Sequence, residues 1–125
     1  MQYTVIAKLI MEKGVDNVTI PETIKFQALT EAGYMLFKEN NYEESAKAFA
    51  KANNVQELLQ AGDWLYQQGR FKDSAYYYQF LKDTKRIESC AHSCMNNGYP
   101  QEAKLLFTVL DNKNMLSFLN ENFGI

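Results

Sequence analysis

Three residues with metal-binding or nucleophilic side chains, Cys90, His92 and Cys94, lie close together in the sequence. Thiolates and imidazoles are ligands that zinc prefers, and a thiol beside an imidazole is the core of a cysteine nucleophile. The chain has no other Cys or His that would complete a zinc site. On a helix with about 3.6 residues per turn, His92 points away from the two cysteines. We therefore expect both cysteines to pack in the core as free thiols, and we expect no metal site and no cofactor.

Catalysis by a Ser-His-Asp or Cys-His arrangement would have to centre on His92, the only histidine of the chain. The sequence shows no set of acid, base and nucleophile that would converge around this residue. We therefore predict that the protein is not an enzyme.

Composition narrows the classes of partner and compartment. The net charge of the 125 residues is −2, which gives no basic surface for nucleic acid. No apolar run approaches the ~18 residues that span a bilayer, so we expect no membrane insertion. Two cysteines are too few for a disulfide scaffold, which favours a cytoplasmic location with reduced thiols.

An internal repeat of 29 residues organises the chain. Residues 26–54, 55–83 and 84–112 align without gaps, and a regular period of this kind is typical of helical solenoids. We expect one domain over residues 1–125. The first two units share seven identical residues, which are Gln27/Gln56, Leu29/Leu58, Ala32/Ala61, Gly33/Gly62, Leu36/Leu65, Ser45/Ser74 and Ala46/Ala75.

Each unit reads as a helical hairpin. Leu29, Ala32, Gly33 and Leu36 follow the i, i+3, i+4, i+7 spacing of one helix face. A polar break follows, and its Gly in the second and third units suits the left-handed residue that ends a helix. Small residues in mid-helix indicate that the second helix approaches closely there. The bulky residues expected opposite these small positions are Phe49, Tyr78 and Phe107.

The segments outside the repeats are predicted to be terminal caps. Residues 1–20 carry a first helix over 1–13 that ends near Gly14, followed by a loop. A strand at the start of this segment would find no partner strand elsewhere. The next helix, about Pro21 to Glu39, is expected to be longer than its counterparts, and residues 113–125 form a C-terminal capping helix. The expected fold is all-α, with about three hairpins and a cap at each end.

The repeat resembles the tetratricopeptide repeat. The resemblance is carried by the Leu, Ala-Gly, Leu stripe and by Gly69-Arg70-Phe71 with the Ser74-Ala75 pair, and it covers roughly residues 26–123. The unit has 29 residues rather than about 34, and it lacks the closing Pro. Similar short units occur in the helical arrays of vesicle-coat and ciliary-transport subunits. The resemblance implies a right-handed α-α superhelix, no catalysis, and a concave face that holds a peptide or partner segment.

The residues expected to face that groove lie along the first helix of each unit. They are mixed polar and aromatic side chains without a Lys/Arg cluster, so a basic clamp for a chain terminus is not supported. An ordinary solvated face is an equally weighted alternative. The predicted groove residues are Gln27, Tyr34, Phe37, Gln56, Asp63, Tyr66, Glu88, His92 and Met95. The expected function is a non-catalytic interaction module for a protein or peptide, such as an adaptor, assembly factor or chaperone-like binder.

A second function stays open because the C-terminal helix is apolar. Leu116, Phe118, Leu119 and Phe123 give it few polar positions, whereas the cap of a solenoid normally has a polar outer face. These residues predict self-association, as a homodimer or as a structural piece of a coat or transport assembly. Surplus tyrosines in the second unit add a further surface, with Tyr76 expected to be exposed and Tyr77 and Phe80 expected to pack between units.

Overall fold

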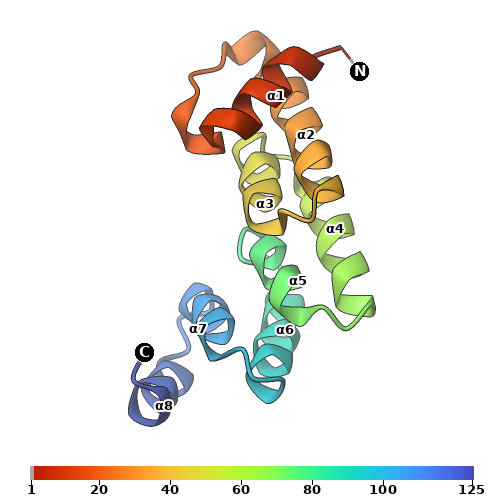
Figure 1. Cartoon of the computed structure of the whole chain (residues 1–125). Coiled ribbons are helices and arrows are strands. Elements are labelled where there is room, and N and C mark those ends of the chain that lie inside the picture. The colour runs from red at the N-terminus through yellow and green to blue at the C-terminus, as the bar shows by residue number, and fades with distance from the viewer. Residues whose placement is uncertain (1) are drawn as a thin grey trace. The chain divides into compact units, whose positions relative to one another are not determined.

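The computed structural model describes residues 2–125, and these form eight α-helices and one 3-10 helix with no strand (Figure 1). The all-α prediction is therefore confirmed. The helices are α1 Thr4–Lys13, α2 Glu22–Lys38, α3 Tyr42–Lys51, α4 Val55–Gln67, α5 Phe71–Tyr78, α6 Thr84–Asn96, α7 Pro100–Val109 and α8 Lys113–Phe123, with the 3-10 helix η1 at Val15–Asn17.

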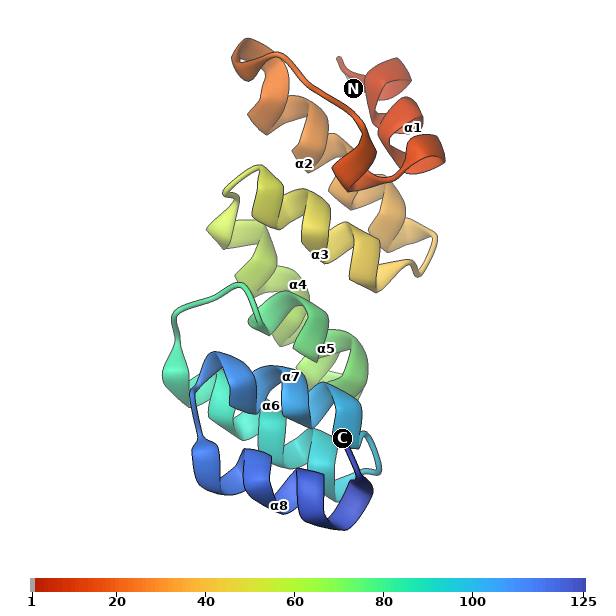
Figure 2. The same cartoon turned by 90° about the vertical axis from the view of Figure 1, so that its left-hand side faces the viewer.

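The chain folds as two compact units, Met1–Leu58 and Leu59–Ile125. In the first unit α2 packs against both α1 and α3 (Figure 1). In the second unit α6 packs between α5 and α7, and α8 lies beside α7 (Figure 2). Neighbours in sequence are thus neighbours in space, which is consistent with a helical repeat.

Helix starts repeat with the period of the sequence. An Asn or Asp precedes α4, α6 and α8, and its side-chain oxygen accepts a hydrogen bond of 3.1–3.2 Å from the backbone N–H three residues later. Such N-caps satisfy a donor that the helix itself leaves unpaired. The three capping residues are spaced by 29 positions, and they are Asn54, Asp83 and Asn112.

Helix ends repeat in the same way. Asn40, Gly69 and Gly98 adopt φ angles of 61°, 75° and 84°, the left-handed region that terminates a helix. The residue after each of them donates its backbone N–H to a carbonyl near the end of α2, α4 or α6, at 2.8–2.9 Å. The predicted helix-ending role of the two glycines is confirmed, and Asn40 fills it in the first unit.

The predicted close approach of the paired helices is present in both units. A Cβ atom on Gly33 would lie 2.4 Å from the Phe49 ring, and one on Gly62 would lie 2.6 Å from the Tyr78 ring. Only glycine leaves room for these rings. The contact is completed by a buried serine in each unit, Ser45 or Ser74, whose hydroxyl donates to the glycine carbonyl; the two bonds are 2.8 and 2.9 Å long.

The end of α5 differs from the expectation. The helix stops at Tyr78, and backbone bonds of the 3-10 type lead from Tyr77 and Tyr78 into the following turn. The side chain of Gln79 donates to the Tyr76 carbonyl at 2.9 Å, which competes with continuation of the helix. Phe80 is consequently exposed rather than packed, and Tyr76 is half-buried rather than exposed. Tyr77 is fully buried, as expected for a packing residue.

The predicted N-terminal helix is confirmed as α1, and Gly14 ends it with φ 98°. A buried carboxylate that the sequence did not reveal anchors its start. The Tyr3 backbone N–H donates to Glu31 Oε1 at 3.4 Å, which places negative charge at the positive end of α1. The Lys51 ammonium donates to the Val15 carbonyl at 2.8 Å and ties η1 to α3.

Gly33→Ala tests the close approach of α2 and α3. The added methyl displaces the Phe49 ring, so we expect a loss of about 1–3 kcal/mol in the free energy of unfolding. Alanine's better helix propensity, worth about 1 kcal/mol, works against that loss. Urea unfolding measures it. Combined with Phe49→Leu, the methyl meets no ring, so the double variant should be more stable than the two separate losses predict.

The control for this cycle is Glu43→Ala on the exposed face of α3, which should change stability by less than ~0.5 kcal/mol. Strict additivity of the Gly33 and Phe49 substitutions would contradict the contact.

Candidate functional site

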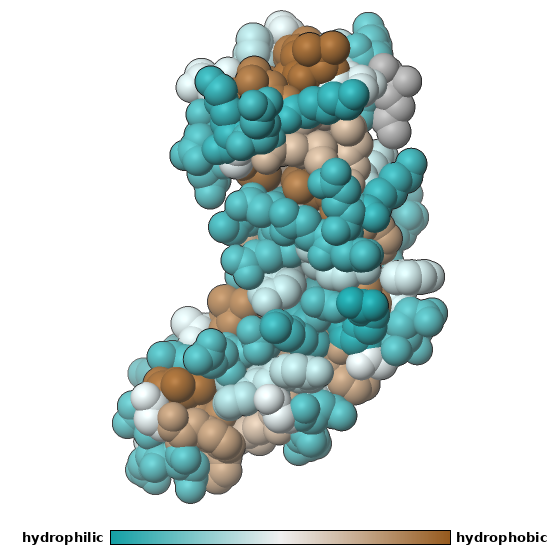
Figure 3. Space-filling model, in the orientation of Figure 1, coloured by the Kyte–Doolittle hydropathy of each residue, from teal (hydrophilic) through white to brown (hydrophobic). Residues whose placement is uncertain are grey.

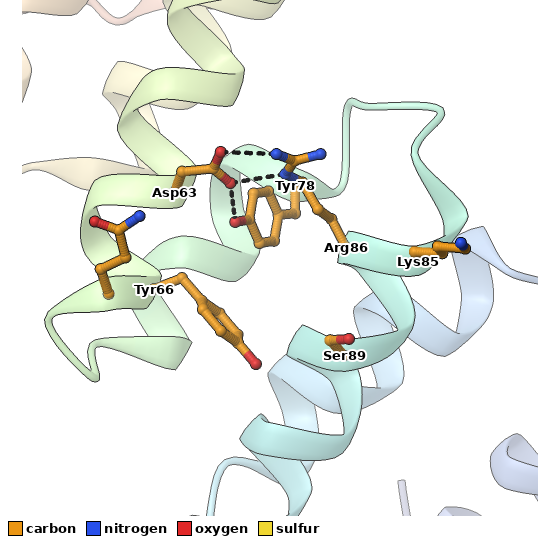
Figure 4. Close-up of a pocket in the computed structure, with 7 residues that line it drawn as sticks. Asp63, Tyr66, Tyr78, Lys85, Arg86 and Ser89 are labelled. Carbon is orange, nitrogen blue, oxygen red and sulfur yellow. Dashed lines mark hydrogen bonds and ion pairs between the residues drawn. The ribbon is translucent and has the colours of Figure 1, made fainter.

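The second unit contains a cavity of about 350 Å³ between α4 and α6, which we call the Tyr66 cavity (Figure 4). Residues of α4, the end of α5 and the first turns of α6 surround it. They are Asp63, Tyr66, Gln67, Tyr78, Lys85, Arg86 and Ser89.

Asp63 is the hub of the polar network in this cavity. Arg86 donates from Nε to Asp63 Oδ1 at 2.9 Å and from Nη2 to Asp63 Oδ2 at 3.1 Å, a bidentate pair that fixes both side chains (Figure 4). The Tyr78 hydroxyl donates to the same Oδ1. Arg86 also donates to Asp83, the N-cap of α6. These hydrogen bonds raise the pKa of Arg86 and lower that of Asp83.

Tyr78 connects this network to the core. Its ring lies against Gly62, and its hydroxyl reaches Asp63 at the cavity wall. Burial is the main cause that raises the pKa of Tyr78 well above its ordinary value, and the hydrogen bond to the Asp63 carboxylate adds to it. The phenol is therefore a fixed neutral donor.

Tyr66 forms an aromatic wall of the cavity. Its ring packs edge-on against Phe71 with centroids 5.0 Å apart, and it also contacts the ring of Tyr78. Its hydroxyl lies 3.1 Å from the Ser93 hydroxyl, and the two share a hydrogen bond. The ring is held at both ends, so the wall is rigid before any ligand arrives.

A second depression of about 330 Å³, the His92 hollow, adjoins the Tyr66 cavity along α6. It is lined by Lys85, Glu88, Ser89 and His92. Lys85 and Ser89 line both spaces. The His92 ring packs edge-on against Phe107 with centroids 5.2 Å apart.

The structure brings four of the predicted groove residues together in the second unit. Asp63 and Tyr66 line the Tyr66 cavity, and Glu88 and His92 line the His92 hollow. Met95, in the last turn of α6, is half-buried and lines neither.

The predicted residues of the first unit lie elsewhere. Gln27 and Gln56 are exposed, while Tyr34 and Phe37 are half-buried. Tyr34 packs edge-on against Phe49, and Phe37 packs edge-on against Tyr42. Burial raises the pKa of Tyr34, and a hydrogen bond with Glu57 adds to this shift.

Sequence reasoning did not assign Arg86, Tyr78 or Ser89 to a site. Arg86 and Asp63 have opposite charges and occupy the same pair of repeat positions as Glu57 and Tyr34, a relation that the 29-residue period could have revealed. Tyr78 was assigned to the core, and only its hydroxyl reaches the cavity.

Cys90 and Cys94 are fully buried, so their predicted place in the core is confirmed. Both thiols donate to the Phe71 carbonyl, at 3.5 and 3.4 Å. The Cys90 thiol and burial together raise the pKa of Cys94, which keeps it protonated and unreactive. Residues 2–125 hold no cluster of three or more His, Cys, Asp or Glu side chains arranged for a metal ion.

Apolar side chains reach the surface on the terminal helices, where Figure 3 shows hydrophobic areas. On α8, Phe118 is 44% exposed and Phe123 is 50% exposed, and their rings meet edge-on at 6.5 Å. Leu119 is fully buried and Leu116 is half-buried. The residues predicted for self-association thus divide between the core and the surface.

None of the helices within residues 2–125 has the length and apolar character needed to cross a bilayer. No protein-family model matches the chain, and neither the curated proteins nor the solved structures contain a significant match. Its function is argued below from the site geometry.

The raised pKa of Tyr78 predicts a loss of stability in alkali. Above pH ~10 the unfolded phenol ionises while the folded one stays protonated, so this residue removes up to ~1.4 kcal/mol of unfolding free energy per pH unit. Tyr78→Phe should be about 1 kcal/mol less stable at pH 8 and should lose stability less steeply from pH 10 to 12. Urea unfolding at each pH measures both effects.

The control is Tyr99→Phe, because the Tyr99 side chain is exposed. An alkaline slope that is the same in wild type and Tyr78→Phe would contradict the role assigned to the Tyr78 hydroxyl.

Proposed function

We propose that this protein is a non-catalytic interaction module that holds a segment of a partner protein against the α4–α6 face of its second unit. One observation carries the proposal: the Tyr66 cavity combines a pre-formed aromatic wall with polar side chains that have no partner in residues 2–125. The ring of Tyr66 is fixed by Phe71 and Ser93, whereas the side chains of Lys85 and Ser89 make no hydrogen bond or ion pair there. Rigid aromatic side chains beside adaptable polar groups are typical of protein recognition sites.

A binding role fits this cavity better than catalysis. Its acid, Asp63, has both oxygens engaged by Arg86 and Tyr78, so it has no free position for a substrate proton. The buried thiols of Cys90 and Cys94 donate to a backbone carbonyl in the core and do not line the cavity.

The resemblance to tetratricopeptide repeats supports the choice of face. In that fold, the inner side of a right-handed superhelix is built from the first helix of each hairpin, and α4 and α6 hold that place here. We infer an adaptor, assembly factor or chaperone-like module on this basis. The reduced, buried thiols favour the cytoplasm as its compartment.

Selection from a random peptide library displayed on phage tests the proposal. Peptides enriched on the wild-type protein should bind Tyr66→Ala and Ser89→Trp about tenfold more weakly or worse, because the first removes the aromatic wall and the second fills the cavity. Fluorescence polarisation with the synthetic peptides measures the affinities. Gln101→Trp, on exposed surface of α7, is the matched control for added bulk.

The proposal is wrong if no peptide is enriched, or if enriched peptides bind the two cavity variants as well as they bind the wild type. Circular dichroism of each variant establishes that its helices are intact.

A second candidate function is self-association through α8, which the exposed pair Phe118 and Phe123 favours. Sedimentation equilibrium at micromolar concentrations should show a concentration-dependent dimer, and Phe118→Ser with Phe123→Ser should abolish it. Val5→Ser with Leu9→Ser, which removes exposed apolar groups from α1, is the control. A wild-type monomer at every concentration would refute this candidate.

A further inference from the structure

We propose that the Tyr66 cavity selects its peptide by an internal acidic side chain, Asp or Glu, which Lys85 binds at the rim of the cavity. This inference rests on the proposed function and specifies the chemistry of the ligand at the same site.

The hydrogen-bond acceptors of the cavity are already used. Asp63 is the only carboxylate that lines it, and its two oxygens accept two bonds from Arg86 and one from Tyr78. A donor on a ligand would have to displace one of these internal bonds. A basic side chain is therefore a poor fit for this cavity.

Hydrogen-bond donors, in contrast, remain available. The Lys85 ammonium and the Ser89 hydroxyl make no hydrogen bond or ion pair within residues 2–125. Lys85 lies beyond Arg86 as seen from Asp63 (Figure 4). An ammonium offers three donors and no acceptor, so the rim is suited to a group with several acceptor oxygens and negative charge.

The charges around the cavity support this assignment. Asp63 and Arg86 neutralise each other in a bidentate pair, and Asp83 is bound by the same guanidinium from outside the cavity. Lys85 is left as the uncompensated charge of the lining. Glu88 lines the adjoining hollow but forms no ion pair with Lys85.

The geometry favours a side-chain carboxylate over the terminal carboxylate of a peptide. Lys85 and Ser89 line both the Tyr66 cavity and the His92 hollow, so they lie in the middle of a continuous surface on α6. A segment that occupies both spaces continues past Lys85 in each direction. The carboxylate that meets Lys85 consequently belongs to a residue inside the segment, and its neighbour on the cavity side packs on Tyr66 as an aromatic or aliphatic side chain.

Synthetic peptide pools test this inference. Each pool has one central residue, Glu, Gln or Lys, flanked by a position that varies among Phe, Tyr, Leu and Met, with Ser and Ala elsewhere. All termini are blocked by acetyl and amide groups, and a fourth pool carries central Gln with a free terminal carboxylate. Fluorescence polarisation should show the Glu pool binding about threefold to tenfold more tightly than the Gln pool, with the preference falling as salt rises.

Substitutions at Lys85 identify the residue that makes the contact. Lys85→Ala should bind the Glu and Gln pools equally, and Lys85→Glu should prefer the Lys pool, while Lys85→Arg should keep the preference for Glu. Lys104→Ala, on exposed surface of α7, is the matched control and should leave every affinity unchanged.

Equal binding of the Glu and Gln pools by wild type, or an undiminished Glu preference in Lys85→Ala, would overturn the inference. So would tighter binding of the free-carboxylate pool than of the Glu pool. In these outcomes the peptides still bind in a manner that depends on Tyr66, so the proposed function survives. Failure of all four pools, together with failure of the phage selection, would instead overturn both.

Discussion

The close approach of paired helices at a glycine is the contact on which the rest of the structure depends. In each unit an aromatic ring occupies the space where a Cβ atom would otherwise stand, and a serine hydroxyl binds the carbonyl of that glycine. In the second unit this contact also positions the site. The Tyr78 ring is held against Gly62, its hydroxyl reaches Asp63, and Asp63 fixes Arg86. Core packing and the polar wall of the cavity are therefore one connected arrangement.

The two units use equivalent positions for different chemistry. Tyr34 and Glu57 in the first unit occupy the same repeat positions as Asp63 and Arg86 in the second. The backbone scaffold tolerates this change because these positions lie on the face of the first helices, outside the ring-and-glycine contact. Only the second unit places a bidentate ion pair there, and a cavity with a rigid aromatic wall lies beside that pair.

The periodic features were accessible from the sequence because each depends on a residue type with a narrow conformational role. Gly69 could be recognised as a helix end, and Gly62 as a close approach, from their spacing alone. The early end of α5 and the buried carboxylate of Glu31 depend on single local contacts that carry no period. The same limit applied to the site: the face was predicted, but the partner of Asp63 is chosen by three-dimensional packing, so Arg86 was missed.

The regular spacing of helix caps has a consequence for how such a chain can change in length. Each stretch of 29 residues supplies both the left-handed residue that stops its first helix and the Asn or Asp that starts the next unit. Duplication or deletion of one stretch therefore adds or removes these hydrogen bonds as a complete set and leaves no orphan backbone group at the junction. The array is built so that gene duplication can lengthen it one unit at a time, while each copy's exposed face is free to diverge.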